Sequence, residues 1–189
     1  MGDPRRRLFF GNAAAAGLLA WAMPTRSRAQ AAAGEGARPQ STPPGETAAV
    51  ALPALGGRLN LPAVALFDGS EFLPAQAVGK VLVIYWWASW CPFCAQQSPH
   101  MEALWRAQRD RGLRMLALSI DRTREAAAGY LQKKGYTFPA GLVTPEIVKS
   151  LPKPKGLPVT LVLGRDGRVV MAEAGQLFPE DVEDIARFL

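Results

Sequence analysis

The sequence has few of the residues that build metal centres. It contains two cysteines and a single histidine, His100, among 189 residues. A structural zinc site takes about four cysteine or histidine ligands. Because the chain offers only these three, we do not expect a metal site, and the two cysteines need another explanation.

The sequence also lacks, near its start, an apolar run long enough to cross a membrane comfortably. Residues 8–23 are largely apolar but are interrupted by Gly11 and Asn12, and a transmembrane helix needs about 20 residues. Three arginines, residues 5–7, precede this run, and polar residues 24–28 follow it. Residues 1–30 therefore have the form of an export signal, with an uncleaved membrane anchor as the alternative.

The sequence also has no excess of acidic residues. Its net positive charge comes mostly from the N-terminal 30 residues. Five arginines and one aspartate lie in the first 30 residues, so the 22 basic and 16 acidic residues of the chain fall to 17 and 15 beyond them. This small remainder gives no reason to expect nucleic-acid binding.

Residues 6–10, Arg-Arg-Leu-Phe-Phe, resemble a twin-arginine export signal, and the Sec route is the alternative. Residues 31–60 are rich in Ala, Gly, Pro, Ser and Thr and contain no aromatic residue. Such a composition buries too little apolar surface to offset the entropy of ordering, so it predicts a flexible linker. A single domain over residues 61–189 would follow, working in the periplasm or anchored to the inner membrane.

Both cysteines follow a strongly apolar segment. Residues 81–86 are all apolar or aromatic and half of them are β-branched, which predicts a strand buried on both faces. A Trp-rich turn then leads to Cys91 and Cys94. Cysteines three residues apart in the first turn of a helix lie on one side of it, close enough for a disulfide.

The position of each cysteine predicts its chemical role. Cys91 would stand at the helix N-terminus, where unpaired N–H groups and the helix dipole lower a thiol pKa below its usual range, so it is the expected nucleophile. Cys94, one turn further in, would be the buried resolving thiol. An inert structural disulfide is the alternative, but a loop this short removes little entropy from the unfolded chain.

The motif Trp90-Cys91-Pro92-Phe93-Cys94 after a buried strand resembles the thioredoxin superfamily. Residues 79–94 as a whole resemble the TlpA/ResA-like family of extracytoplasmic thiol-disulfide oxidoreductases, and the resemblance extends over about residues 60–189. It implies a thioredoxin-like α/β fold with a central mixed sheet flanked by helices. It also implies a β-hairpin extension, expected at residues 61–73, ahead of the Gly79-Lys80 pair.

The remaining pattern fits this fold. A proline inside the helix after the cysteines, Pro99, is what the superfamily shows. Residues 139–150 are read as a short strand or turn before a helix around 145–151. The other expected elements are strands at 115–120, 159–163 and 169–174, a helix at 123–134 that begins near an Asp or Thr cap, and a C-terminal helix from Pro179.

Residues 156–160, Gly-Leu-Pro-Val-Thr, resemble the second signature of the family. The resemblance implies that Pro158 is cis and lies against the cysteine pair, and that the backbone of Leu157 pairs with an extended partner segment. A trans proline at the start of a strand is the alternative. Trp90, Pro92 and Phe93 are expected to shape the surface on which partners dock.

The sequence departs from its relatives at two positions. Thioredoxins have a buried Asp where this chain has Tyr85, and TlpA/ResA-like proteins often have Glu where it has Gln97. Either acid is thought to assist proton transfer at the buried thiol. Tyr85 and Gln97 are therefore candidate proton-transfer supports, whereas His100 lies too far along the helix to reach a sulfur.

The resemblance implies a dithiol that needs no cofactor beyond the Cys91–Cys94 disulfide. Its partners would be proteins bearing disulfides or dithiols, often cytochrome c or copper-site precursors, together with a membrane electron donor. Two alternatives stay open: a disulfide-donating oxidase, and a copper-binding module that uses the dithiolate. The basic loop at residues 153–155 is either a solvated turn or a contact for an acidic partner.

Overall fold

The computed structural model describes residues 52–189. The expected export signal or anchor at residues 1–30, and residues 31–51 of the linker expected at 31–60, lie outside the described residues. The last part of that segment is described, and residues 56–58 pair with Arg168 and Val169. Among the residues that are described, no helix is both long and apolar enough to span a membrane.

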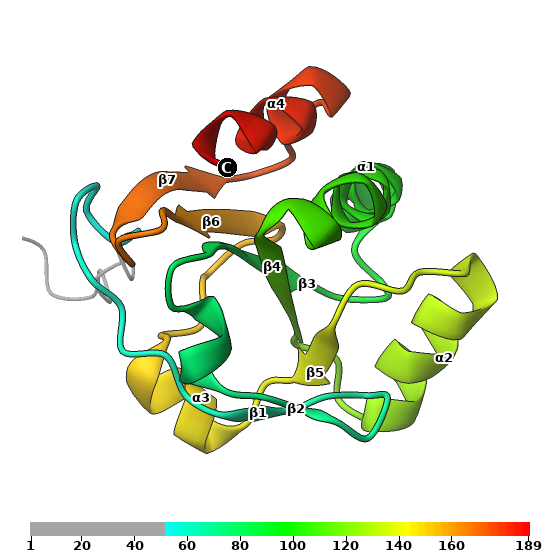
Figure 1. The fold of residues 1–189 in the computed structure, drawn as a ribbon. Coiled ribbons are helices and arrows are strands. Elements are labelled where there is room, and N and C mark those ends of the chain that lie inside the picture. The colour runs from blue at the N-terminus through cyan, green and yellow to red at the C-terminus, as the bar shows by residue number, and fades with distance from the viewer. Residues whose placement is uncertain (1–51) are drawn as a thin grey trace, which may run out of the picture. The chain divides into compact units, whose positions relative to one another are not determined.

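The core of the described domain is a five-stranded mixed sheet in the order β5-β4-β3-β6-β7 (Figure 1). The central strand β3 runs parallel to β4 on one side and antiparallel to β6 on the other. The outer strand β5 is parallel to β4, and the outer strand β7 is antiparallel to β6. The strand bounds are Val81–Trp87 for β3, Leu113–Ser119 for β4, Ala140–Leu142 for β5, Val159–Leu163 for β6 and Val169–Ala174 for β7.

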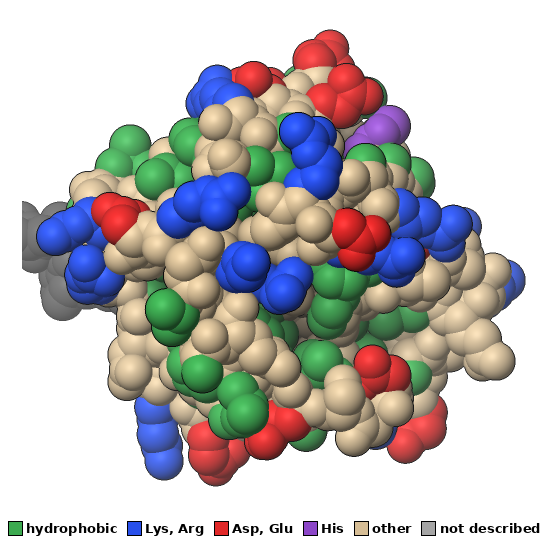
Figure 2. Space-filling view, viewed as in Figure 1, with side chains coloured by type: hydrophobic (Ala, Val, Ile, Leu, Met, Phe, Trp, Pro, Cys, Tyr) green, Lys and Arg blue, Asp and Glu red, His purple; other side chains and the backbone are tan. Residues whose placement is uncertain are grey.

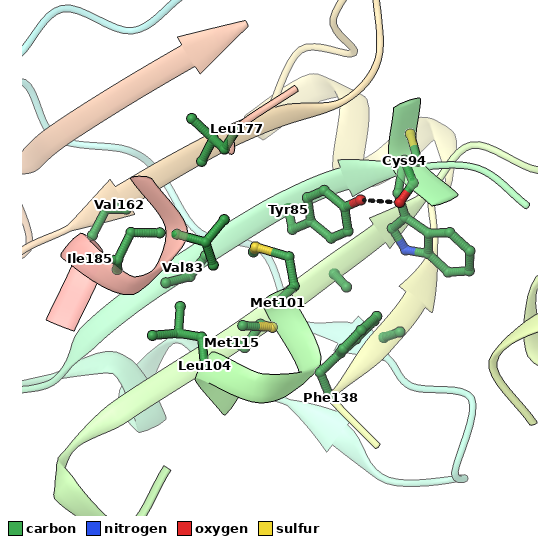
Figure 3. Packing of buried hydrophobic residues seen from close by; sticks show 14 of the residues in the cluster. Val83, Tyr85, Cys94, Met101, Leu104, Met115, Phe138, Val162, Leu177 and Ile185 are labelled. Atoms are coloured by element: carbon green, nitrogen blue, oxygen red, sulfur yellow. Dashed lines mark hydrogen bonds between the residues drawn. The ribbon is translucent and has the colours of Figure 1, made fainter. Parts of the chain in front are cut away.

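Helices cover both faces of this sheet, as the resemblance implied. Alternate residues of β3 face opposite sides: Val83 and Tyr85 pack in one core cluster, while Leu82 and Ile84 pack in the other. The first cluster is closed by α1 (Pro92–Gln108), α2 (Arg124–Lys134) and α4 (Pro179–Asp184), and the second by α3 (Pro145–Ser150) and the N-terminal hairpin. Figure 3 shows the first cluster, in which side chains of β3, α1 and β4 meet.

The N-terminal hairpin is present and covers an edge of the sheet. It consists of β1 (Val64–Ala65) and β2 (Glu71–Phe72), which pair antiparallel. Leu66 then forms a bridge with Gly141 of the outer strand β5. A Cβ atom on Gly141 would lie 2.7 Å from the carbonyl oxygen of Ala65, so the close approach of the hairpin requires glycine at this position.

The other expected elements are found with shifted ends. α1 contains Pro99 and is continued by a 3-10 helix, η2 (Arg109–Arg111), up to Gly112, whose positive φ of 103° ends it. Thr123 caps α2 by accepting a hydrogen bond from the amide of Ala126 at 3.2 Å. The C-terminal helix is shorter than expected: α4 gives way to a 3-10 helix, η3 (Ile185–Phe188).

One buried carboxylate, which the sequence did not single out, fastens α1 to the segment before β5. Glu102 accepts hydrogen bonds from the amide and hydroxyl of Thr137 at 2.7 Å, and from the guanidinium of Arg106 at 2.5 Å. Burial alone would raise the pKa of Glu102, but the hydrogen bonds from Thr137, Arg106 and Phe138 together lower it. The helix that carries the cysteines is thus held at its middle.

Candidate active site

The two cysteines form a disulfide at the start of α1, at the end of the sheet where β3 terminates. Their Cα atoms are 5.2 Å apart. Cys91 is the N-cap residue of the helix and Pro92 its first residue, a position where the missing N–H of proline is no loss. The amide of Cys94 donates a hydrogen bond to Sγ of Cys91 at 3.1 Å. The first sulfur therefore occupies the place of an N-cap acceptor, where negative charge is stabilised.

The disulfide is buried, but the aromatic side chains next to it are exposed to solvent. The side chains of Cys91 and Cys94 are nearly covered, at 4% and 1% exposure, whereas Trp90 and Phe93 next to them are 65% and 55% exposed. Large exposed aromatic side chains beside a shielded reactive bond favour docking of an apolar partner surface. Trp90 and Phe93 are thus available at the surface beside the disulfide, and the docking of partners on Trp90, Pro92 and Phe93 stays a prediction.

Tyr85 lies beneath the helix start, with its hydroxyl directed at the backbone of Cys94 (Figure 3). The hydroxyl donates to the carbonyl oxygen of Cys94 at 3.3 Å and lies 3.1 Å from the hydroxyl of Ser98. Burial raises the pKa of Tyr85 far above its usual value. The phenol therefore stays protonated and acts here as a hydrogen-bond donor to the helix, not as a base.

Gln97 is fully buried, and both ends of its amide are bonded. Its Nε2 donates to the hydroxyl of Thr160 at 2.9 Å, and its Oε1 accepts from the amide of Leu177 at 2.9 Å. Thr160 belongs to β6, and Leu177 precedes α4. Gln97 thus joins the cysteine-bearing helix to two distant parts of the chain.

The peptide bond between Leu157 and Pro158 is cis, which rules out the trans alternative. Val159, the first residue of β6, is the register partner of Trp86 near the end of β3, so Pro158 lies at the same end of the sheet as the disulfide. The carbonyl oxygen of Pro158 accepts from the amide of Gly175 at 2.9 Å. Leu157 is half-buried against both core clusters.

A buried carboxylate near the disulfide escaped the sequence analysis. Asp121 accepts hydrogen bonds from the amide and hydroxyl of Ser89 at 3.0 and 2.6 Å, and from the hydroxyl of Ser119 at 2.6 Å. Ser89 lies in the turn between β3 and Cys91, which the bond from the amide of Cys91 to the carbonyl of Ala88 closes at 3.2 Å. Asp121 therefore anchors the turn that delivers the nucleophile.

The sequence held a signal for this contact. Asp121 follows β4, which is parallel to and adjacent to β3, so the carboxyl ends of both strands meet at one edge of the sheet. We had expected an Asp or Thr at this point to cap the next helix. Thr123 is that cap, and Asp121 faces the active-site turn instead.

Two other polar features of the sequence border hollows whose lining includes neither cysteine. His100 lines a hollow beside α4 with Ala107 and Glu183. The loop at residues 153–155 precedes the cis proline, and Pro154 lines a small apolar hollow with Trp86. Within residues 52–189, no group of three or more His, Cys, Asp or Glu side chains is arranged to hold a metal ion.

The contact between Ser89 and Asp121 can be tested with a matched pair of variants. Ser89→Ala and Ser119→Ala each remove one hydroxyl bond to the same carboxylate, at a cost of about 1.5–3 kcal/mol of unfolding free energy. Ser119→Ala also removes the bond that its hydroxyl accepts from the amide of Asp121 at 3.1 Å, so it is at least as destabilising. Only Ser89→Ala loosens the turn that places Cys91 at the helix N-terminus. We expect alkylation of Cys91 in the reduced protein at neutral pH to slow about three- to tenfold in Ser89→Ala and to change little in Ser119→Ala.

Equal alkylation rates in the two variants, despite similar losses in urea unfolding, would mean that Asp121 only stabilises the fold.

Comparison with known proteins identifies the family. Residues 55–189 match the redoxin family. ResA of Bacillus thuringiensis, named as a thiol-disulfide oxidoreductase, is 26% identical over 116 residues, which make up 61% of this chain and 67% of the relative.

Solved structures of low sequence identity show the same fold. A thioredoxin-family thiol:disulfide interchange protein from Chlorobium tepidum has a TM-score of 0.66 at 21% identity and covers 71% of this chain and 97% of its own. A secreted thiol-disulfide isomerase from Corynebacterium glutamicum has a TM-score of 0.61 at 20% identity, and the match covers 68% of this chain and 82% of the isomerase. The fold is therefore thioredoxin-like, and the chain belongs to the redoxin family and is similar to thiol-disulfide oxidoreductases of the ResA type.

Proposed function

We propose that the protein works outside the cytoplasm and reduces disulfides in partner proteins through Cys91 and Cys94. The observation that carries the redox role is the place of the Cys91 sulfur, which accepts the amide hydrogen bond of Cys94 at 3.1 Å at the N-terminus of a long helix. This position stabilises a thiolate on Cys91 over one on Cys94. It makes Cys91 the attacking sulfur.

The reaction runs in two exchanges. In the first, the Cys91 thiolate attacks one sulfur of the partner disulfide, so that a mixed disulfide forms and the other partner sulfur leaves as a thiolate. In the second, the Cys94 thiolate attacks the Cys91 sulfur and releases the remaining partner sulfur. The partner gains two electrons, and the protein is left with the Cys91–Cys94 disulfide.

Proton transfer from Cys94 finds no base at Tyr85 or Gln97. The carboxylate of Asp121 is already bonded to Ser89 and Ser119. Cys94 is buried, which raises the pKa of its thiol, yet it must lose a proton before the second exchange. Tyr85 stays protonated, and the Gln97 amide is neutral and bonded at both ends. The proton therefore passes to the thiolate that left in the first exchange, directly or through water.

The location and the electron source follow from the sequence and from the chemistry. The pattern of residues 1–30 supports export to the periplasm or anchoring at the inner membrane, and one relative of similar fold is described as secreted. Each turnover leaves the protein oxidised, so a reductase in this compartment needs a donor that carries electrons across the membrane. Protein disulfides, such as those of cytochrome c or copper-site precursors, are the proposed substrates.

The assignment of roles to the two cysteines is tested by trapping. With insulin as the substrate, reduced Cys94→Ser should complete only the first exchange and accumulate about one mixed disulfide per molecule, because no second thiol resolves it. Cys91→Ser should accumulate far less, since the remaining thiol is buried and has a raised pKa. Non-reducing mass spectrometry measures both products.

Accumulation of the mixed disulfide by Cys91→Ser in preference to Cys94→Ser would reverse the roles and contradict the proposed mechanism.

The glutamine at position 97, where relatives often have a glutamate, allows a second prediction. In Gln97→Glu a carboxylate can accept from both the Leu177 amide and the Thr160 hydroxyl, so the contacts survive, and burial raises the pKa of the new acid. We expect reduction of insulin near neutral pH to become about three- to tenfold faster, with a new ionisation in the pH–rate profile.

Gln96→Glu is the matched control, because Gln96 is exposed on the same helix turn. Unchanged rates in Gln97→Glu, or equal gains in both variants, would show that proton transfer at Cys94 does not limit the reaction.

A further inference from the structure

The end of the domain opposite the cysteines collects basic side chains. β3 and β4 start side by side, with Leu82 paired to Arg114, and β6 ends beside the start of β3, with Leu163 paired to Leu82. The segments that flank these strand ends therefore meet. They bring together seven basic residues, here called the basic end: Arg58, Lys80, Arg109, Arg111, Arg114, Arg165 and Arg168.

The charge of the basic end is little neutralised. The segments 58, 79–82, 109–114 and 164–168 contain two acidic residues, Asp110 and Asp166. Their ion pairs with Arg109 and Arg168 are 3.8 and 3.6 Å long and largely exposed, and exposed pairs of this kind are weak. Figure 2 shows Lys and Arg side chains gathered across the middle of one face of the molecule.

Several of these guanidinium groups are held in place by neutral partners. Arg58 donates to the carbonyl oxygen of Asp166 at 2.7 Å, Arg168 to that of Gly56 at 2.7 Å, and Arg114 to that of Leu113 at 3.0 Å. Backbone carbonyls orient the side chains without cancelling their charge. Because these side chains are already ordered, they lose less conformational entropy when a ligand binds.

An apolar hollow lies among these cations. It has a volume of about 260 Å³ and is bordered by Arg58, Lys80 and Arg165, with Leu61, Leu82 and Leu163 among its apolar lining residues. Val78, which also lines it, is 78% exposed. Cations around an apolar depression match a ligand that has both a phosphate group and apolar carbon chains.

The described chain enters the domain at this same end. The amide of Gly56 donates to the carbonyl of Val169, and the amide of Val169 donates to the carbonyl of Gly57. The backbones of Arg58 and Arg168 form an isolated antiparallel β-bridge. The strand β3 then leads from the basic end to the turn before Cys91. The basic end and the disulfide thus lie at opposite ends of the central strand.

We propose that the basic end binds the surface of a membrane that contains anionic phospholipids. Arginine guanidinium groups bind lipid phosphates in a bidentate manner, and the exposed Val78 and the hollow beside it receive apolar lipid groups. A nucleic acid would use the charges but not the hollow. If the protein is exported as proposed above, this contact keeps the cysteines facing away from the membrane, toward soluble partners.

The test is co-sedimentation of the full chain, in the disulfide form, with vesicles of phosphatidylglycerol and phosphatidylcholine or of phosphatidylcholine alone. The triple variant Lys80→Gln, Arg111→Gln, Arg165→Gln removes charge from the basic end. The control variant Lys133→Gln, Lys134→Gln, Lys149→Gln removes the same charge from exposed positions on α2 and α3. Residues 1–51 are identical in both variants, so a difference between them reports on the domain.

We expect the first variant to bind the anionic vesicles about 10- to 100-fold more weakly than the wild type and the control variant to lose less than about threefold, with little difference among the three proteins on phosphatidylcholine alone. Equal losses in both variants would overturn the proposal. So would binding of a DNA duplex that is as tight as vesicle binding and equally sensitive to the first variant.

Insulin reduction without vesicles separates this inference from the proposed function. Both triple variants should reduce insulin at the wild-type rate, so loss of vesicle binding with retained reductase activity supports the inference. Retained vesicle binding in a wild type that fails to reduce insulin would contradict the proposed function alone.

Discussion

The hydrogen bonds between Asp121 and Ser89 fix the one turn at which the central strand becomes the active-site helix. β3 is buried along its whole length and shares both core clusters, so its end has little freedom. The chain must then reverse into α1 within a few residues and present Cys91 as the N-cap. The carboxylate of Asp121, just beyond the neighbouring parallel strand β4, holds that turn by accepting hydrogen bonds from the amide and hydroxyl of Ser89. The placement of the reactive sulfur depends on this contact between two strand ends.

The sequence predicted those parts of the structure whose signal is local. The apolar run of β3, the pair Cys91 and Cys94 and the hairpin at the N-terminus each carry their information within a few neighbouring residues. The cis state of Pro158 came from a resemblance over five residues. The features with a local signal are found in the structure because short-range sterics and periodicity dictate them, whereas the cis proline was implied by the resemblance alone.

The contacts that join distant segments could not be predicted in the same way. Ser89 and Asp121 are 32 residues apart, Gln97 and Thr160 are 63 apart, and Gln97 and Leu177 are 80 apart. A single polar residue gives no sign of its distant partner, so the sequence identified Gln97 as a position that lacks an acid and as a candidate support for proton transfer, but not as a link between segments. The structure shows that it also fastens α1 to β6 and to the segment before α4. Gln97 therefore replaces the acid of the relatives with an amide that links three segments of the chain.

The central claim is that Cys91 and Cys94 form a dithiol that reduces partner disulfides. The equilibrium reduction potential of the Cys91–Cys94 pair, measured in glutathione or dithiothreitol buffers with metal ions chelated, tests it most directly. A potential of about −250 mV or lower is the value expected of a reductant that receives electrons across the membrane. A potential near about −120 mV is that of a disulfide-donating oxidant and would contradict the reductase assignment.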